Sequence, residues 1–203
     1  MAKLEKICVY CGSGRGNDPA YAQAAETLGQ SMAKAGIELV YGGGSVGLMG
    51  ITAKSVLDHG GRVTGIIPGF LQQREAMLDD VQELIITEDM HERKRMMFNH
   101  AQAFVALPGG IGTLEELVEM LTWAQLGRHK KPVLLANING FWDPLTVLLN
   151  HMRNEEFIRD GMEVGFLTAS RAEDIVPRLI EAAAAVPDSA IGVGHDSDDL
   201  KRL

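Results

Sequence analysis

Short apolar runs alternate with longer amphipathic segments along most of this chain. A short run bounded by turn residues predicts a buried strand, and apolar positions at helical spacing predict an amphipathic helix. The first run spans Leu4 to Tyr10, and a helix is expected from Pro19 to about Ala35, with proline suited to its first turn. Asp89 is a candidate N-cap for another helix.

The remaining elements follow the same pattern. Further strands are predicted at Glu38 to Tyr41, Arg62 to Ile67, Val81 to Ile86, Ala103 to Leu107, Pro132 to Ala136 and Val164 to Leu167. Further helices are predicted at Leu48 to about His59, Met90 to about His100, Leu114 to about Gly127, Asp143 to about Asn154 and Arg171 to about Ala184. Strands that alternate with helices predict a parallel sheet joined by right-handed crossovers. We therefore expect a single α/β domain over residues 1–186, a doubly wound, Rossmann-like parallel sheet with helices on both faces. A flexible acidic tail is expected over residues 187–203.

Composition and net charge disfavour two classes of partner, nucleic acids and membranes. The chain has 203 residues, of which 46% are hydrophobic and 23% charged, with a formal net charge of -8. This negative charge disfavours nucleic acid as a partner, because phosphate backbones are repelled. No apolar segment has the length of a membrane span, and Met1 to Lys6 is too polar for a secretory signal, so we expect a cytoplasmic protein without a membrane partner.

Metal chemistry is not predicted. Cys8 and Cys11 form a Cys-x-x-Cys pair, but their odd separation in a strand points them to opposite faces. We interpret them as two reduced structural cysteines. None of the six histidines has a cysteine or histidine at metal-ligand spacing, so no metal and no cofactor is expected.

Three glycine-rich turns follow predicted strands, at Cys11 to Asp18, Gly42 to Gly47 and Pro108 to Thr113. In doubly wound sheets ligands bind beyond the carboxyl ends of the strands. Glycine lets a ligand approach the main chain, and the first amides of a helix favour phosphate. We expect Ser13, Gly43 and Gly44 to contact such a ligand.

The kind of nucleotide follows from what the motifs lack. Gly42, Gly44 and Gly47 fit the dinucleotide fingerprint, which also requires an acidic residue roughly 20 positions on to bind the ribose. That place holds Ile67 and Pro68. The Walker pattern of nucleoside triphosphatases is absent. Phosphate-binding turns with nearby carboxylates suit a nucleoside monophosphate.

Two charged segments flank the third glycine-rich turn. Glu115 and Glu116 follow it, and their alternative role is to complement the dipole of a first helical turn. His91 to Met97 precedes it, and its alternative is a solvated helical face with local pairs such as Glu92 with Arg95. Arg93 and Lys94 begin that helix, and an arginine fork suits phosphate or ribose oxygens.

Together these segments resemble a known family. Met90-His91-Glu92-Arg93-Lys94, followed by Pro108-Gly109-Gly110-Ile111-Gly112-Thr113-Leu114-Glu115-Glu116, is similar to the signature of the LOG ("Lonely Guy") family. These cytokinin-activating phosphoribohydrolases were historically mislabelled as lysine decarboxylases. The resemblance extends from about Ile7 to Ala185 and includes Tyr41 to Gly50 and Leu121 to Gly127.

The resemblance implies hydrolysis of the N-glycosidic bond of AMP or N6-prenylated AMP, which gives free base and ribose 5-phosphate. It implies a homodimer with the active site near the interface. By motif, Arg93 and Glu116 match the catalytic pair. Positions that match the phosphate loop are Gly109, Gly110, Gly112 and Thr113, and positions that match other substrate contacts are Glu75, Lys94, Glu115 and Thr122. Ile111, where many plant members have tyrosine, and the missing proline before Arg74-Glu75 bear on base preference.

The residues also suggest a mechanism. Positive charge develops on the ribose during cleavage, so a fixed carboxylate, here Glu116, stabilises the transition state or activates water. Arg93 is expected to position ribose or phosphate and to hold Glu116 ionised. Two alternatives stay open at this point. One is a nucleotide-binding sensor or carrier without hydrolase activity, and the other is a pyridoxal-phosphate decarboxylase, for which no distinctive Schiff-base lysine is evident.

Overall fold

The computed structural model describes residues 3–72, 81–159, 161–187 and 190. Seven parallel strands form one sheet in the order β4-β3-β2-β1-β5-β6-β7. The strands are β1 (Lys6–Tyr10), β2 (Glu38–Tyr41), β3 (Val63–Pro68), β4 (Glu83–Thr87), β5 (Ala103–Ala106), β6 (Val133–Ala136) and β7 (Leu167–Ala169). Strand order reverses between β1 and β5, which confirms the doubly wound topology.

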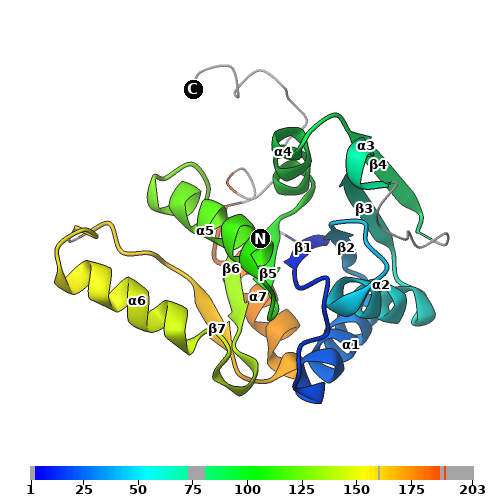
Figure 1. Cartoon of the computed structure of the whole chain (residues 1–203), viewed down its shortest axis with the longest axis horizontal. Helices are drawn as coiled ribbons and strands as arrows, with labels where there is room; N and C mark the ends of the chain where they lie inside the picture. The colour runs from blue at the N-terminus through cyan, green and yellow to red at the C-terminus, as the bar shows by residue number, and fades with distance from the viewer. Residues whose placement is uncertain (1–2, 73–80, 160, 188–189, 191–203) are drawn as a thin grey trace.

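Helices cover both faces of this sheet. They are α1 (Pro19–Lys34), α2 (Gly47–Asp58), α3 (Gly69–Gln72), α4 (Met90–His100), α5 (Ile111–Gln125), α6 (Asp143–Asn154) and α7 (Ile175–Ala184). Short 3-10 helices lie at Ile138–Gly140 and Ala172–Asp174. In Figure 1, α4, α5 and α6 lie on the upper left of the sheet, and α1, α2 and α7 lie on its lower right.

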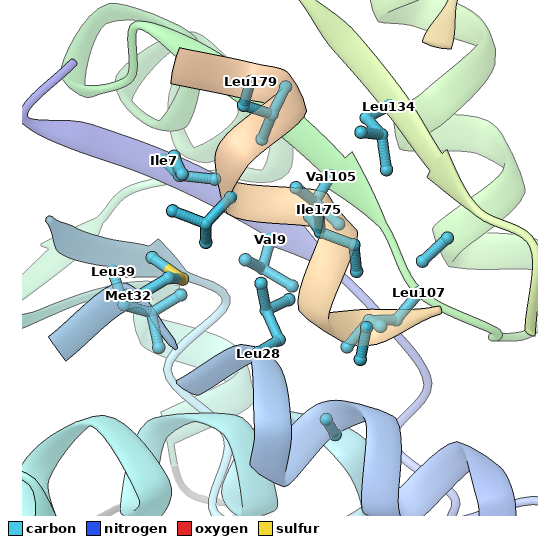
Figure 2. Close-up of a cluster of buried hydrophobic side chains, with 14 of the residues drawn as sticks. Ile7, Val9, Leu28, Met32, Leu39, Val105, Leu107, Leu134, Ile175 and Leu179 are labelled. Atoms are coloured by element: carbon cyan, nitrogen blue, oxygen red, sulfur yellow. The ribbon is translucent and has the colours of Figure 1, made fainter. Parts of the chain in front are cut away.

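Each face has its own hydrophobic core. Leu28 and Met32 of α1 and Leu179 of α7 pack with Ile7 and Val9 of β1 on one face (Figure 2). The other face buries Met97 of α4 and Leu117 of α5 against Phe104 of β5. Burial on both faces explains why the central strands read as continuous apolar runs.

The two cysteines confirm the prediction that they point to opposite faces. Cys8 lies in the core beneath α4 and α5, and Cys11 lies in the core beneath α1. Both thiols are free and buried, and burial raises the pKa of each well above its usual value. They therefore stay protonated and behave as small apolar side chains.

Three predicted boundaries are wrong. The last helix begins at Ile175 rather than Arg171, because the residues before it form the 3-10 helix Ala172–Asp174. The last strand is Leu167–Ala169, not Val164 to Leu167, because register with β6 pairs Leu134 with Leu167 and Ala136 with Ala169. Helix α5 begins at Ile111, a turn earlier than Leu114, because Gly110 is extended and its carbonyl accepts from the Leu114 amide. Apolar spacing could not mark this turn, since the Ile111 side chain is 82% exposed.

Some expectations fall on other parts of the chain. Glu75 lies outside the described residues. The predicted tail, residues 187–203, also lies outside them except for residues 187 and 190. Across the described ranges, no helix combines the length and apolar character needed to cross a bilayer.

Candidate active site

The three glycine-rich turns meet at the carboxyl edge of the sheet, as predicted from their places after β1, β2 and β5. Strand β1 lies between β2 and β5. The Gly12 amide donates to the Pro108 carbonyl at 3.1 Å, and the Leu48 amide donates to the Gly12 carbonyl at 3.0 Å. The turn after β1 is thus hydrogen bonded to segments that follow both neighbouring strands.

A cleft of about 370 Å³ opens at this edge, between the turn after β1 and the starts of α2, α4 and α5. Many of the predicted site residues line it. They are Ser13, Arg93, Gly110, Gly112, Thr113, Glu115 and Glu116. The cleft therefore brings the phosphate-loop motif and the catalytic-pair motif to one place.

The start of α5 forms one wall of the cleft. Gly110 is its N-cap, no side chain caps the helix, and no acid lies in its first turn. Glu115 and Glu116 lie a turn further on, so the alternative that they complement the helix dipole from the first turn is wrong. The uncapped amides are free to bind an anion, and the Thr113 hydroxyl lies beside them.

Arg93 is held by three elements. Its Nε donates to the Ile66 carbonyl of β3 at 3.1 Å, and Nη2 lies 3.5 Å from the Gly42 carbonyl after β2. Its Nη1 donates to Glu116 Oε1 of α5 at 3.2 Å. A Cβ atom at Gly42 would collide with the guanidinium, so glycine at this position makes room for the arginine.

Glu116 is buried, and the pKa of its carboxyl group lies near neutral pH. Its side chain is 11% exposed. Burial raises its pKa to about 7, which the opposing charge of Arg93 only partly offsets. Arg93 favours the ionised carboxylate, as expected, but desolvation has the larger effect on its pKa.

Lys94 is committed to protein carboxylates. Its Nζ donates to Glu115 Oε1 at 2.6 Å and to Glu119 Oε1 at 3.1 Å. Burial alone would lower its pKa, but the hydrogen bonds to the two carboxylates outweigh burial and raise it. Lys94 does not line the cleft among the residues that the structure describes, so it supports the wall rather than forming it.

A second hollow of about 320 Å³ adjoins the cleft. It lies between the turns after β1 and β5 and shares Ser13 and Gly110 with the cleft, while Gly109 lines this hollow but not the cleft. Tyr21 and Phe141 form its aromatic wall, with their rings edge to face at 5.6 Å. Phosphate-loop residues therefore border both spaces.

Some predicted contacts lie elsewhere. Gly43 and Gly44 are buried beside the cleft and line neither space within the described residues. Thr122 is exposed on the outer part of α5, where its hydroxyl donates to the Val118 carbonyl at 2.8 Å. Only some residues of the predicted motifs therefore line the cleft.

Other cleft residues were missed. Met49 and Met90, each near the start of a helix that follows a strand, line the cleft. Their place at the carboxyl edge was a usable signal. The Ile66 carbonyl was not predictable in this way, although it lies at the end of the strand where a dinucleotide enzyme would have its ribose-binding acid.

Comparisons with known proteins agree with the motifs. Residues 49–179 match a family model described as "Possible lysine decarboxylase". The chain is 45% identical over 195 residues to the cytokinin riboside 5'-monophosphate phosphoribohydrolase LOG of Oryza sativa subsp. japonica, covering 96% of this chain and 79% of the rice protein. It is 45% identical over 182 residues to LOG3 of Arabidopsis thaliana, covering 90% and 85%.

The chain belongs to the LOG family. Solved structures share the fold of this LOG family member. A molybdenum cofactor binding protein from Rippkaea orientalis superimposes with a TM-score of 0.67 at 23% identity, covering 89% of this chain and 98% of that one. The molybdenum cofactor carrier protein of Chlamydomonas reinhardtii gives 0.67 at 22%, covering 90% and 99%. At this identity the likeness concerns the fold alone.

The decarboxylase label has little support in the lysines of this LOG family member. A Schiff base forms from an unprotonated amine, and the raised pKa of Lys94 opposes deprotonation. Burial lowers the pKa of Lys131 to about 8, but Lys131 precedes β6 and lies at the amino edge of the sheet, opposite the cleft. Neither lysine combines a reactive amine with a place in the cleft.

Proposed function

We propose that this chain hydrolyses the N-glycosidic bond of a cytokinin riboside 5'-monophosphate or AMP and releases free base and ribose 5-phosphate. The observation that carries the proposal is the buried Arg93–Glu116 pair, 3.2 Å apart, beside the uncapped start of α5. Curated relatives at 45% identity, of which the chain covers most, are named phosphoribohydrolases of this substrate class.

Glu116 is the catalytic carboxylate in this proposal. As the bond between C1' and the base nitrogen breaks, the ribose gains oxocarbenium character, and a nearby carboxylate stabilises it. The oxygen of a water molecule bonds to C1', and Glu116 accepts one proton from that water. The departing base nitrogen takes up one proton, so the overall reaction consumes one water for each bond cleaved. A pKa of about 7 suits a group that accepts a proton near neutral pH.

Arg93 orients Glu116 and the sugar phosphate. Its hydrogen bond to the Ile66 carbonyl fixes the guanidinium before substrate arrives, so little reorganisation is needed during the reaction. The carboxylate of Glu116 then faces the cleft in one orientation. This role does not require Arg93 to transfer a proton.

The phosphate binds at the start of α5. Gly110, Gly112 and Thr113 line the cleft there, and Gly109 and Ser13 border the adjoining hollow. Backbone amides at a helix start bind phosphate through hydrogen bonds and the helix dipole. This remote binding energy orients the ribose over Glu116 and explains a preference for nucleotides over nucleosides.

The remaining site assignments rest on the family motif. Gly43, Gly44, Lys94, Glu115 and Thr122 belong to this group, together with Glu75. We propose that Gly43 and Gly44 shape the turn that receives Arg93, since the adjacent Gly42 carbonyl lies 3.5 Å from its guanidinium. Glu115 lines the cleft, and Lys94 holds its side chain there through the ion pair that joins them.

We also infer a homodimer formed through α5 and α6. Ile111 and Val118 are exposed on α5, as is Leu126 directly after it, and Val147 and Leu148 are exposed on α6. A hollow of about 460 Å³, lined mainly by apolar side chains of these helices, runs between them and reaches Gly110 at the cleft. In Figure 1 both helices lie on the outer left of the molecule, where a second copy would cover this face beside the active site.

One assay tests the proposed reaction. The purified protein is incubated with AMP and with N6-isopentenyl-AMP, and ribose 5-phosphate and free base are quantified. We expect equal amounts of both products from at least one substrate. Binding of nucleotide by calorimetry without release of base would overturn the hydrolase and support the carrier alternative.

A further inference from the structure

Glu119 is a half-buried acid near the catalytic pair that belongs to none of the motifs discussed above. It lies one helical turn after Glu115 on α5, so the two carboxylates lie on the same side of the helix. Lys94 of α4 bridges them, at 2.6 Å from Glu115 Oε1 and 3.1 Å from Glu119 Oε1. A single cation thus joins two helices through two acids.

The two acids differ in burial. The side chain of Glu115 is 53% exposed, whereas that of Glu119 is 24% exposed. Glu119 Oε2 is buried and has no hydrogen-bond partner within the described part of the chain. Water screens an exposed ion pair more than a half-buried one, so the Lys94–Glu119 pair anchors the lysine on its less exposed side, in addition to the shorter Lys94–Glu115 pair.

We propose that Glu119 is a positioning residue for the Arg93–Glu116 pair and acts through Lys94, an assignment that rests on the proposed hydrolysis. Arg93 and Lys94 are neighbours in α4, and their partners Glu116 and Glu119 are both on α5. Two adjacent side chains of one helix are therefore anchored to the other. Fixing Lys94 fixes the rotation of the first turn of α4, which sets where the Arg93 guanidinium meets Glu116.

Glu119 also contributes to the charge around the catalytic carboxylate. The charged groups that act on Glu116 are Arg93 and Lys94 of α4 and Glu115 and Glu119 of α5. Three buried groups of β1 and the residue after it, Cys8, Tyr10 and Cys11, also lie within electrostatic reach of Glu116 and are neutral. The negative charge of Glu119 raises the pKa of Glu116, so removing it lowers that pKa.

The substitution Glu119→Gln tests the proposal, because it keeps the shape of the side chain and removes its charge. The matched control is Glu173→Gln, which removes one acid of the exposed Arg171–Glu173 pair, outside the cleft. We expect kcat of Glu119→Gln to fall about 10- to 100-fold, as for a small displacement of a catalytic group. We also expect the rise of kcat/KM with pH to move to lower pH, and the control to match wild type.

A double-variant cycle identifies the route. If Glu119 acts through Lys94, adding Glu119→Gln to Lys94→Met produces no further loss of kcat. Unchanged kcat and pH dependence in Glu119→Gln, or losses that add fully in the double variant, would overturn the assignment. So would a lower active fraction with wild-type kcat and pH dependence, which indicates a purely structural role. An inactive wild-type protein would instead overturn the proposed function and this assignment with it.

Discussion

Arg93 and Glu116 form an ion pair of 3.2 Å in which each side chain is nearly nine-tenths buried. Arg93 also donates to a backbone carbonyl of β3, whereas burial leaves Glu116 with a pKa of about 7. Geometry thus fixes the arginine and makes the carboxyl group able to exchange a proton near neutral pH. The following predictions depend on this pair and on the surface beside it.

Replacing the carboxylate should stop the reaction without abolishing binding. We expect Glu116→Gln to lower kcat by about 100- to 10,000-fold, the range that a positioned acid or base contributes. Nucleotide affinity, measured by calorimetry, should stay within a few-fold, since the α5 amides that we propose to hold phosphate are unchanged. Retained turnover would remove Glu116 from its catalytic role.

The same substitution should stabilise the protein at alkaline pH. The pKa of Glu116 rises from 4.5 to about 7 on folding, so between these values the folded protein binds more protons than the unfolded one. Stability attributable to this group therefore falls as pH rises. The free energy of unfolding of Glu116→Gln relative to wild type should increase by about 2 to 3 kcal/mol from pH 5 to pH 8.

Urea unfolding at the two pH values measures this difference. The exposed Glu173 provides the control, and Glu173→Gln should show no comparable trend. A difference between Glu116→Gln and wild type that does not vary with pH would contradict the raised pKa.

Activity should rise with pH through about 7. In the proposed mechanism the ionised form of Glu116 stabilises the sugar cation or activates water, and the ionised fraction increases as pH rises through its pKa. The measurement is kcat/KM between pH 5 and 9. Because the phosphate of AMP also titrates near this range, the profile should be repeated with adenosine as a poor substrate. A rise that disappears with adenosine would assign it to the substrate instead.

Lysine should not replace arginine at position 93. A lysine ammonium lacks the planar fork with which Arg93 contacts both the Ile66 carbonyl and Glu116. We expect Arg93→Lys to lower kcat/KM on the order of 100-fold. Arg171→Lys, in an exposed ion pair, serves as the matched control and should behave as wild type. Equal activities of the two variants would show that the fork is not needed.

A charge on the α5 face should disrupt the proposed dimer. Val118 is 42% exposed on α5, and Ile180 is 44% exposed on α7 on the opposite face. We expect Val118→Glu to give a monomer and Ile180→Glu to leave a dimer in sedimentation velocity, because only the first charge is buried by association. A monomeric wild type, or a Val118→Glu dimer as stable as wild type, would exclude this interface.

Local pattern was sufficient for most elements of the fold. The helix Asp143–Asn154 and the helix Met90–His100 with its Asp89 cap lie where sequence periodicity predicted them, since apolar spacing and capping are local properties. The edge strand β7 and the start of α5 were misplaced. Register with a neighbouring strand and an extended glycine decided these two boundaries, and neither has a side-chain signal.

Some properties of the site were likewise predictable from the sequence, and others depend on the tertiary structure. The sequence by itself determined the doubly wound sheet, the meeting of three glycine-rich turns at its carboxyl edge and the residues of the family motif. Alternating strands and helices predict a parallel sheet whose strand ends share one edge, and motif spacing is a property of the chain itself. Only the tertiary structure decided that Lys94 is bound by Glu115 and Glu119, that Ile66 holds Arg93, and that Glu116 has a pKa of about 7. These properties depend on how far each helix buries its charges against distant segments, and burial is not a local property of the chain.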